Sequence, residues 1–402
     1  MIIVIGGGPA GFMAAITARR ARPGEPVLLL EQGADVLRKV AVSGGGRCNV
    51  THACFDPREL VKSYPRGGRE LRGPFHHFGP AETEAWFAAE GVRLKTEDDG
   101  RMFPVTDRSA TIVEALVGAA RTAGVEVRTR TVVTALERTG EGFGCRTSGG
   151  DLAARAVVLA TGGRTSAGGG PSGYDLAAAL GHTIVPPVPS LFTFRSSAPL
   201  LAGLAGVATE VRLKAEGLDS SGPLLITHKG VSGPAVLRLS AWGARALCDR
   251  GYAFELAVDW LPATADADAL LRDRIRDHGK RQIAGDHPHP LPARLWAALV
   301  RECGIPDPAR WADLGKEPRR RLASALKGTI LPVTGQAPFK EEFVTCGGVA
   351  LAEVDFRTMA SRPCPGLHLA GEVLDIDGIT GGFNFQNCWT TGWLAGRGAA
   401  DG

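Results

Sequence analysis

The first strand of this chain runs directly into a glycine pattern that constrains the fold more than any other feature. The β-branched run "IIVI" is followed at once by Gly6, Gly8 and Gly11 in G-x-G-x-x-G register, and an alanine-rich helical segment comes next. In such a unit the first glycine permits the turn, the second lets backbone approach a pyrophosphate, and the third lets helix and strand pack closely. We therefore expect a Rossmann-like α/β unit that binds a dinucleotide at a helix N-terminus.

A second apolar run, "PVLLLEQG", strengthens this prediction. It contains Glu31, twenty residues after Gly11, and a carboxylate at this distance can accept both hydroxyls of an adenosine ribose. Strand, glycines, helix, second strand and terminal acid in this order form a much stronger signal than the glycines alone. We expect Pro9 and Ala10 to lie at the phosphates, and Glu31 and Gln32 to lie at the ribose.

FAD and NAD both use this unit, and later stretches favour FAD. "GVEVRTRTVVTALE" (124–137) is interpreted as one strand, whose Val133 could touch an adenine. "ARAVVLATGG" (154–163) is a buried strand that ends in a turn found in flavoproteins of the two-dinucleotide-binding-domain type. The residues expected at the cofactor in this turn are Thr161, Gly162 and Gly163.

The C-terminal stretch "PGLHLAGEVLDIDGITGGFNFQ" belongs to the same domain as the N-terminus. It predicts an apolar strand, then Gly371 and Glu372, a glycine turn and a helix that starts near Gly382. In such flavoproteins an acid at this position lies against the ribityl chain. The helix would direct its N–H groups at the flavin C2 carbonyl and stabilise negative charge on the reduced ring.

A second literal match, "GGGPSG" (168–173), does not predict a second dinucleotide site. Seven residues separate Gly168 from the end of the preceding strand at Ala160, whereas the fingerprint needs the strand to run into the glycines. Any nicotinamide must then bind through a less recognisable surface, or the electron donor is another molecule.

Five stretches in fixed order resemble the BaiN-like, aminoacetone-oxidase-like family of FAD-dependent oxidoreductases. They are "KxxxSGGGRCNxT" (39–51), "DGRMFP" (99–104), "LLITHKGVSGPAVLRLS" (224–240), "VTCGGV" (344–349) and "GEVLDIDGITGGFNFQ" (371–386). The resemblance covers essentially the whole chain. It implies an FAD domain, an inserted β-rich domain and a small helical domain within the insert.

The residue patterns suggest boundaries for these three parts. Short alternating runs broken by Gly and Pro favour antiparallel strands in the middle of the chain, and helical spacing follows them. We predict the FAD-binding domain at 1–185 and 344–402, the β-rich domain at 186–262 and 329–343, and the helical domain at 263–328.

The resemblance also implies which residues meet the flavin or the pyrophosphate. Ser43 to Asn49 would form a loop past the ring, with Arg47 and Asn49 as polar contacts and Cys48 near the ring. The other residues that it implies in the loop and at the C-terminal helix are Lys39, Gly44, Gly45, Gly46, Phe383, Asn384 and Gln386.

The cysteines of "RCNVTHAC" leave one alternative. A disulfide reductase carries a C-x4-C pair at a similar place, but Cys48 and Cys54 are spaced C-x5-C. Such reductases also have a C-terminal His–Glu pair and a full NAD domain, which this sequence lacks. A thiol that packs on the cofactor is therefore preferred over a redox couple. The eight cysteines form no C-x-x-C and no zinc pattern, so no metal is expected.

The predicted activity is hydride transfer between flavin N5 and a small organic substrate. The family includes C=C reductases that use NAD(P)H and amine oxidases of the aminoacetone type that use O₂, and the sequence does not choose between them. Candidate substrate contacts are Arg101, Tyr174 and His228, of which His228 could be a proton donor.

A flavoprotein that binds RNA or a protein partner is an alternative of another class. The net charge of +4 and the run Arg319 to Arg321 motivate it, but aromatic residues are 6% of the chain and no stacking platform is evident. We expect no nucleic acid and no membrane partner. The absence of a signal peptide and of disulfide patterns favours a cytoplasmic protein, monomeric or weakly homodimeric.

Overall fold

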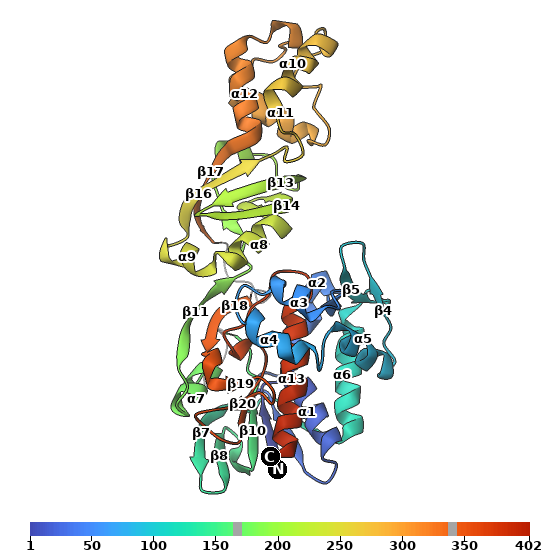
Figure 1. The fold of residues 1–402 in the computed structure, drawn as a ribbon, viewed down its shortest axis with the longest axis vertical. Helices are drawn as coiled ribbons and strands as arrows, with labels where there is room; N and C mark the ends of the chain where they lie inside the picture. The colour runs from blue at the N-terminus through green and yellow to red at the C-terminus, as the bar shows by residue number, and fades with distance from the viewer. Residues whose placement is uncertain (164–170, 337–343) are drawn as a thin grey trace. The chain divides into compact units, whose positions relative to one another are not determined.

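The computed structural model describes residues 1–163, 171–336 and 344–402, and the chain forms two compact units. Unit 1 comprises Met1–Pro189 and Lys340–Gly402, and unit 2 comprises Ser190–Phe339 (Figure 1). Unit 2 contains both the strands and the helices that the sequence analysis assigned to a second and a third domain, so the three-part division stays a prediction.

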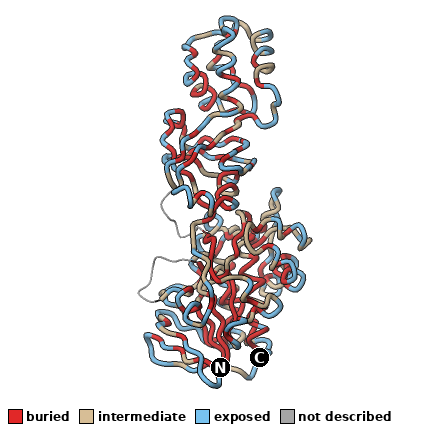
Figure 2. The backbone as a smooth tube through the Cα atoms, turned by 60° about the vertical axis from the view of Figure 1, so that its left-hand side comes forward, coloured by how far each residue is buried: buried red, intermediate tan, exposed pale blue. Residues whose placement is uncertain are grey.

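Unit 1 is built on a seven-stranded sheet. Its order is β19 (Val354–Asp355), β20 (Ala360–Ser361), β21 (Leu367–Leu369), β10 (Ala156–Leu159), β1 (Ile2–Ile5), β2 (Val27–Leu30) and β6 (Glu126–Arg128). The strands from β21 to β6 are parallel. Every residue of the central strands β1, β2 and β10 is buried, as expected for a parallel sheet covered on both faces (Figure 2). The α/β Rossmann-like fold predicted from the sequence is confirmed.

Helices α1 (Pro9–Ala21) and α13 (Phe383–Asp401) pack against each other although they come from opposite ends of the chain (Figure 1). A Cβ atom at Gly392 would lie 2.5 Å from the carbonyl oxygen of Ala10, and one at Gly396 would lie 2.4 Å from that of Ala14. Glycine is therefore required where the two helices approach. The contact joins the two chain ends in one domain, as predicted.

The other elements of unit 1 surround this sheet. Between β2 and β10 lie α2 (Arg38–Gly46), β3 (Thr51–His52), α3 (Pro57–Leu60), α4 (Gly68–Phe75), α5 (Pro80–Ala89), β4 (Leu94–Thr96), β5 (Arg101–Pro104), α6 (Ser109–Ala123), β7 (Val133–Thr139), β8 (Gly142–Thr147) and β9 (Gly150–Ala154). Strands β3, β5 and β4 form one small sheet, and β7, β8 and β9 form another. Helix α7 (Gly173–Ala179), β11 (Ile184–Ser190), β18 (Val344–Val349) and the 3₁₀ helix η5 (Gly371–Val373) follow.

The prediction of a single strand at 124–137 is wrong. The chain forms β6 and β7 there, in two different sheets. Arg130 between them adopts a left-handed φ of 52°, and the amides of Arg130 and Thr131 donate to the carbonyl oxygens of Gly33 and Glu31. These bonds to the end of β2 divert the chain out of the main sheet.

Unit 2 contains a closed antiparallel barrel. Its strands, in order, are β12 (Phe194–Arg195), β15 (Gly230–Ser232), β14 (Leu218–Thr227), β13 (Ala208–Ala215), β16 (Ala253–Asp259) and β17 (Thr329–Gln336). Alternate residues of β13 are buried, which matches the pattern of short alternating runs in the sequence. The helices of this unit are α8 (Pro234–Trp242), α9 (Ala244–Asp249), α10 (Ala267–His278), α11 (Ala293–Glu302) and α12 (Lys316–Gly328).

A buried carboxylate organises the helical part of unit 2. Asp286, at the start of the Pro/His stretch 286–292, accepts hydrogen bonds from His278 Nδ1 (2.5 Å), Trp311 Nε1 (2.9 Å), Arg281 Nη1 (3.0 Å) and Arg274 Nη1 (3.1 Å). Burial alone would raise the pKa of Asp286, but these hydrogen bonds lower it to about 2. The stretch is therefore a structural centre.

None of the helices in the described ranges combines the length and the apolar character that crossing a bilayer requires.

Candidate cofactor site

The glycines between β1 and α1 leave a space that fits a pyrophosphate. A Cβ atom at Gly6 would lie 2.4 Å from the carbonyl oxygen of Ala160, and one at Gly11 would lie 1.9 Å from that of Gly6. Gly8, the residue before α1, has no atom within 4 Å of its Cβ position. Backbone packing thus requires Gly6 and Gly11, whereas the space beside Gly8 and the helix N-terminus is open to a phosphate, with Pro9 and Ala10 in the first turn.

Glu31 is fixed next to this space by two backbone amides. Its Oε2 accepts from the amide of Gly7 at 2.8 Å, and its Oε1 accepts from that of Gly33 at 2.7 Å. A carboxylate oxygen has a further lone pair, so both oxygens can still accept from ribose hydroxyls. The neighbouring Gln32 is exposed, and Val133 is buried at the start of β7.

The predicted glycine loop is present at the end of α2. Helical geometry stops at Ser43, whose ψ is 153°, and Gly44, Gly45 and Gly46 have φ values of 57°, 67° and 85°. Three successive left-handed residues are strained for any residue except glycine. All three glycines are exposed, and no atom lies within 4 Å of the Cβ position of Gly45 or Gly46. The loop therefore offers uncovered backbone for close approach by a flat ring.

Four elements distant in sequence meet at Glu372. Its Oε2 accepts from Lys39 Nζ at 2.7 Å, and its Oε1 accepts from the amide of Thr345 at 2.8 Å. Burial alone would lower the pKa of Lys39, but the charge and hydrogen bond of Glu372 raise it above its usual value. Gly163 packs against the same carboxylate, because a Cβ atom there would lie 2.8 Å from Glu372 Oε1. Lys39, Gly163 and Glu372, with Gly371 beside it, are thus brought together as predicted site residues.

The turn after β10 contains an unsatisfied hydroxyl. Thr161 Oγ1 is buried and has no hydrogen-bond partner among the described residues. Gly162 beside it has a φ of 76° and no atom within 4 Å of its Cβ position. Buried polar atoms normally have partners, but a Cβ atom at Gly173 would lie 1.8 Å from this hydroxyl, so it packs against the start of α7. The open cradle at Gly8 and the oriented Glu31 fit FAD.

Two asparagines shape the turn before α13. Asn49, with its amide oriented to satisfy both neighbours, accepts from the amide of Gly382 at 3.0 Å and donates to the Thr51 carbonyl at 2.9 Å. Asn384 accepts from the amide of Gly378 and donates to its carbonyl, both at 2.8 Å. Helix α13 begins at Phe383, as predicted, and the two side chains fix the backbone at its N-terminus.

Two predicted cofactor contacts have no exposed surface. Gln386 Oε1 accepts from the hydroxyls of Thr51 (2.5 Å) and Thr83 (3.0 Å), and its Nε2 donates to Thr390 at 3.0 Å. Cys48 is 0% exposed, and burial raises the pKa of its thiol to about 12. Cys48 and Cys54 are both free thiols. The two buried side chains support the loop and α13 from within the core, so contact with a ligand would require their neighbours to move.

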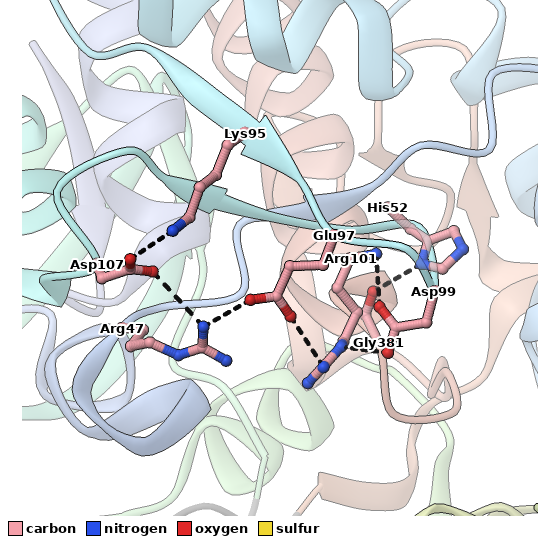
Figure 3. Close-up of polar contacts among 8 residues, drawn as sticks. All are labelled: Arg47, His52, Lys95, Glu97, Asp99, Arg101, Asp107 and Gly381. Atoms are coloured by element: carbon pink, nitrogen blue, oxygen red, sulfur yellow. Dashed lines mark hydrogen bonds and ion pairs between the residues drawn. The ribbon is translucent and has the colours of Figure 1, made fainter.

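Arg47 and Arg101 belong to one chain of charged groups (Figure 3). Glu97 bridges them, with Oε1 2.6 Å from Arg47 Nη1 and Oε2 2.9 Å from Arg101 Nη2. Arg101 Nε also donates to Asp99 at 2.7 Å, and the Arg47 guanidinium lies 4.0 Å from the centre of the Phe103 ring. These contacts fix the β4–β5 hairpin beside the glycine loop. Arg47 was predicted to contact the cofactor, but here its polar contacts are with protein carboxylates.

Two candidate substrate contacts remain. Tyr174 is buried on α7, and His228 is exposed in the turn between β14 and β15 of unit 2. Their roles stay predictions. Residues 168–170 of the second glycine-rich stretch lie outside the described residues, and Ser172 caps α7 by accepting from the amide of Asp175.

Sequence reasoning missed His52, the last residue of β3. Its Nδ1 lies 3.2 Å from the carbonyl oxygen of Gly381, and its ring lies against that of Phe383 with centroids 4.7 Å apart. Burial lowers the pKa of this histidine. Its place three residues after Asn49 in "RCNVTH" was the available signal.

Comparisons with known proteins agree with this geometry. A family model described as "HI0933-like protein Rossmann domain" matches residues 1–398. A 3-dehydro-bile acid delta(4,6)-reductase of Clostridium scindens is 33% identical over 99% of this chain and 98% of its own. A ribosomal RNA dihydrouridine synthase of Escherichia coli is 31% identical over 98% of this chain and 96% of its own.

The solved structures show a similar fold at low identity. A 3-ketosteroid-delta4-(5alpha)-dehydrogenase of Rhodococcus jostii RHA1 has a TM-score of 0.52 and 16% identity, covering 99% of this chain and 96% of that one. An open conformation of a flavocytochrome c3 fumarate reductase has a TM-score of 0.52 and 18% identity, and the match covers 100% of this chain and 78% of that one. At this identity the likeness concerns the fold alone.

Proposed function

The chain belongs to the HI0933-like Rossmann-domain family, and on this premise we propose that it reduces an activated C=C bond of a small organic substrate with NAD(P)H as electron donor. It is an FAD-dependent oxidoreductase. The open space beside Gly8 at the N-terminus of α1 carries the cofactor assignment, because backbone packing explains Gly6 and Gly11 but leaves Gly8 to a ligand.

FAD, when bound, supplies the two-electron chemistry that amino-acid side chains lack. The protein holds it. The amides at the start of α1 would bind the pyrophosphate, Glu31 would bind the ribose, and the Lys39–Glu372 pair would orient the ribityl chain. The exposed loop Gly44 to Gly46 would contact the ring, and the N-terminus of α13 would stabilise negative charge on it.

The names of the relatives support reduction over amine oxidation. One is a bile acid delta(4,6)-reductase, and the other is a synthase of dihydrouridine, which forms when the C5=C6 bond of uridine is reduced. Both names denote addition of hydrogen across a C=C bond next to a carbonyl group. An activated alkene is therefore the first substrate class to test.

A uridine in RNA is the second candidate, since relatives from Escherichia coli and Haemophilus influenzae are both ribosomal RNA dihydrouridine synthases. The run of arginines on α12 gives it little support. Arg319 pairs with Asp268 at 2.8 Å, Arg320 lies 3.5 Å from Glu317, and Arg321 donates to the Cys303 carbonyl. Two of the three arginines lie close to carboxylates and the third bonds to a backbone carbonyl, so the run forms a poor phosphate-binding patch.

Anaerobic mixing followed at the flavin absorbance band tests the proposal. Bleaching by NADH or NADPH, and recovery on adding an α,β-unsaturated ketone, is the expected result. Bleaching by aminoacetone but by neither nucleotide would replace it with the amine oxidase. If mass spectrometry finds dihydrouridine in ribosomal RNA that was unmodified before turnover, and the C=C bond of no unsaturated ketone is reduced, uridine in RNA becomes the favoured substrate.

A further inference from the structure

His52 is held in one orientation and one tautomer. A carbonyl oxygen only accepts, so the 3.2 Å contact with Gly381 places a hydrogen on Nδ1. Nε2 is then the unprotonated, basic nitrogen of the neutral ring. The ring of Phe383, inclined by 30° to that of His52, supports one face.

The Nε2 edge of this histidine faces Gly100. A Cβ atom at position 100 would lie 2.6 Å from Nε2, so the backbone of Gly100 packs against this edge and only a residue without a side chain fits there. The charged groups that act on the ring are Asp99 and Arg101 of the β4–β5 hairpin, which bond to each other at 2.7 Å. Gly381 and Phe383, on the other side, bring no titratable group.

His52 lies where two elements assigned to the flavin meet. The glycine loop Gly44 to Gly46 leads into β3, and a Cβ atom at Gly382 would lie 2.5 Å from the carbonyl oxygen of Thr51, the residue before His52. The other histidines described in unit 1 are placed differently. His182 and His368 are buried with partners elsewhere, and His76 and His77 follow α4.

We propose that His52 is a catalytic residue that donates, from Nε2, the proton that completes reduction of the C=C bond. The inference rests on the proposed function. Reduction adds a hydride to one alkene carbon and a proton to the other; the hydride, with its electron pair, comes from NAD(P)H, which is oxidised to NAD(P)⁺. The protonated ring breaks its Nε2–H bond to give the proton to the carbanionic carbon, and a proton from solution then restores the Nε2–H bond. The Gly381 carbonyl stabilises the imidazolium through Nδ1–H throughout.

His52→Asn is the decisive variant, because its amide nitrogen can still donate toward Gly381 while the acid is lost. Each protein is reduced with NADPH without oxygen and then mixed with an α,β-unsaturated ketone over a range of pH. We expect unchanged flavin content and unchanged reduction by NADPH, but recovery of the flavin band slowed roughly 100-fold. The wild-type rate should fall as pH rises, since the donor must be protonated, and the variant should lose this dependence. His77→Gln, an exposed histidine in the same unit, should behave as wild type.

A spectroscopic readout checks the geometry without turnover. Nitrogen-15 NMR of labelled histidine, assigned by comparison with His52→Asn, should show the neutral ring protonated at Nδ1. A neutral ring protonated at Nε2 would overturn the proposal, as would a variant that keeps the wild-type rate and pH profile. A wild-type protein that NADPH reduces but no alkene reoxidises would instead refute the proposed function, and the role of His52 with it.

Discussion

Lys39 Nζ lies 2.7 Å from the carboxylate of Glu372 across 333 residues of sequence. The pair joins the helix that leads into the glycine loop to the segment that follows β21, so a charge contact holds these two parts of the candidate cofactor site together. The Glu372 side chain is 13% exposed, which makes its cation hard to replace with water.

Lys39→Met should destabilise the protein and loosen the cofactor. It leaves a mostly buried carboxylate without its cation, which costs about 1–3 kcal/mol. Urea unfolding of the apoprotein measures this change, and flavin fluorescence measures release of the cofactor. The double variant Lys39→Met/Glu372→Gln should be less destabilised than the sum of the single ones, because the two groups interact directly. Additive effects would show that the pair contributes little.

Gly8→Val should abolish FAD retention without harming the fold. The Cβ position of Gly8 is free of protein atoms, so the added side chain takes only the space assigned to the pyrophosphate. The absorbance ratio of flavin to protein after purification measures retention, and thermal unfolding of both apoproteins measures stability. Gly24→Val is the control, since Gly24 is exposed and, like Gly8, has no atom within 4 Å of its Cβ position. A fully yellow Gly8→Val protein would place the cofactor elsewhere.

Asp286→Asn should destabilise the helical part of unit 2 at neutral pH by about 1–3 kcal/mol. The pKa of Asp286 is lowered from 3.8 to about 2, so its ionised form stabilises the fold above pH 4. This contribution is lost as pH falls from about 4 to about 2, where wild type and variant should converge. Urea unfolding at several pH values, followed by tryptophan fluorescence, reports on the buried Trp296 and Trp311 nearby. If wild type and Asp286→Asn still differ in unfolding free energy at pH 2, the stabilising role given to the ionised Asp286 is wrong.

Cys48→Ser should leave reduction of the flavin by NADPH largely intact. The thiol is fully buried and its raised pKa, about 12, keeps it protonated and unreactive. In the native protein a thiol reagent should modify the partly exposed Cys54 before Cys48, which peptide mass spectrometry can follow. Collapse of turnover in the serine variant, with FAD retained, would give this cysteine a chemical role.

The parts of the fold that sequence could predict are those set by local patterns. The strand, the glycine spacing and Glu31 specify the cradle within a few tens of residues, and Gly382 marks the start of α13 because the helix follows directly. The interior position of Gln386 could not be read in this way, since its partners Thr51, Thr83 and Thr390 include residues about 300 positions away. Asp286 was missed for the same reason, because its donors come from α10 and from the segment around Trp311.

The break between β6 and β7 shows a second limit of sequence reasoning. Residues 124–137 have the β-branched composition of one continuous strand. The chain turns there because the carbonyl oxygens of Glu31 and Gly33 accept from Thr131 and Arg130, and a bond between distant segments leaves no local pattern.

Strands β11 and β18 run side by side in opposite directions, since Thr183 bonds to Ala350 and the Cβ position of Gly347 meets Pro186. The chain therefore leaves unit 1 and returns to it on two paired strands. An insert of different length or fold could be attached at these two strands without a change in the elements that hold Gly8, Glu31 and Glu372. Chimaeras that exchange only residues 190–339 should therefore keep the cofactor-site residues of unit 1 in place.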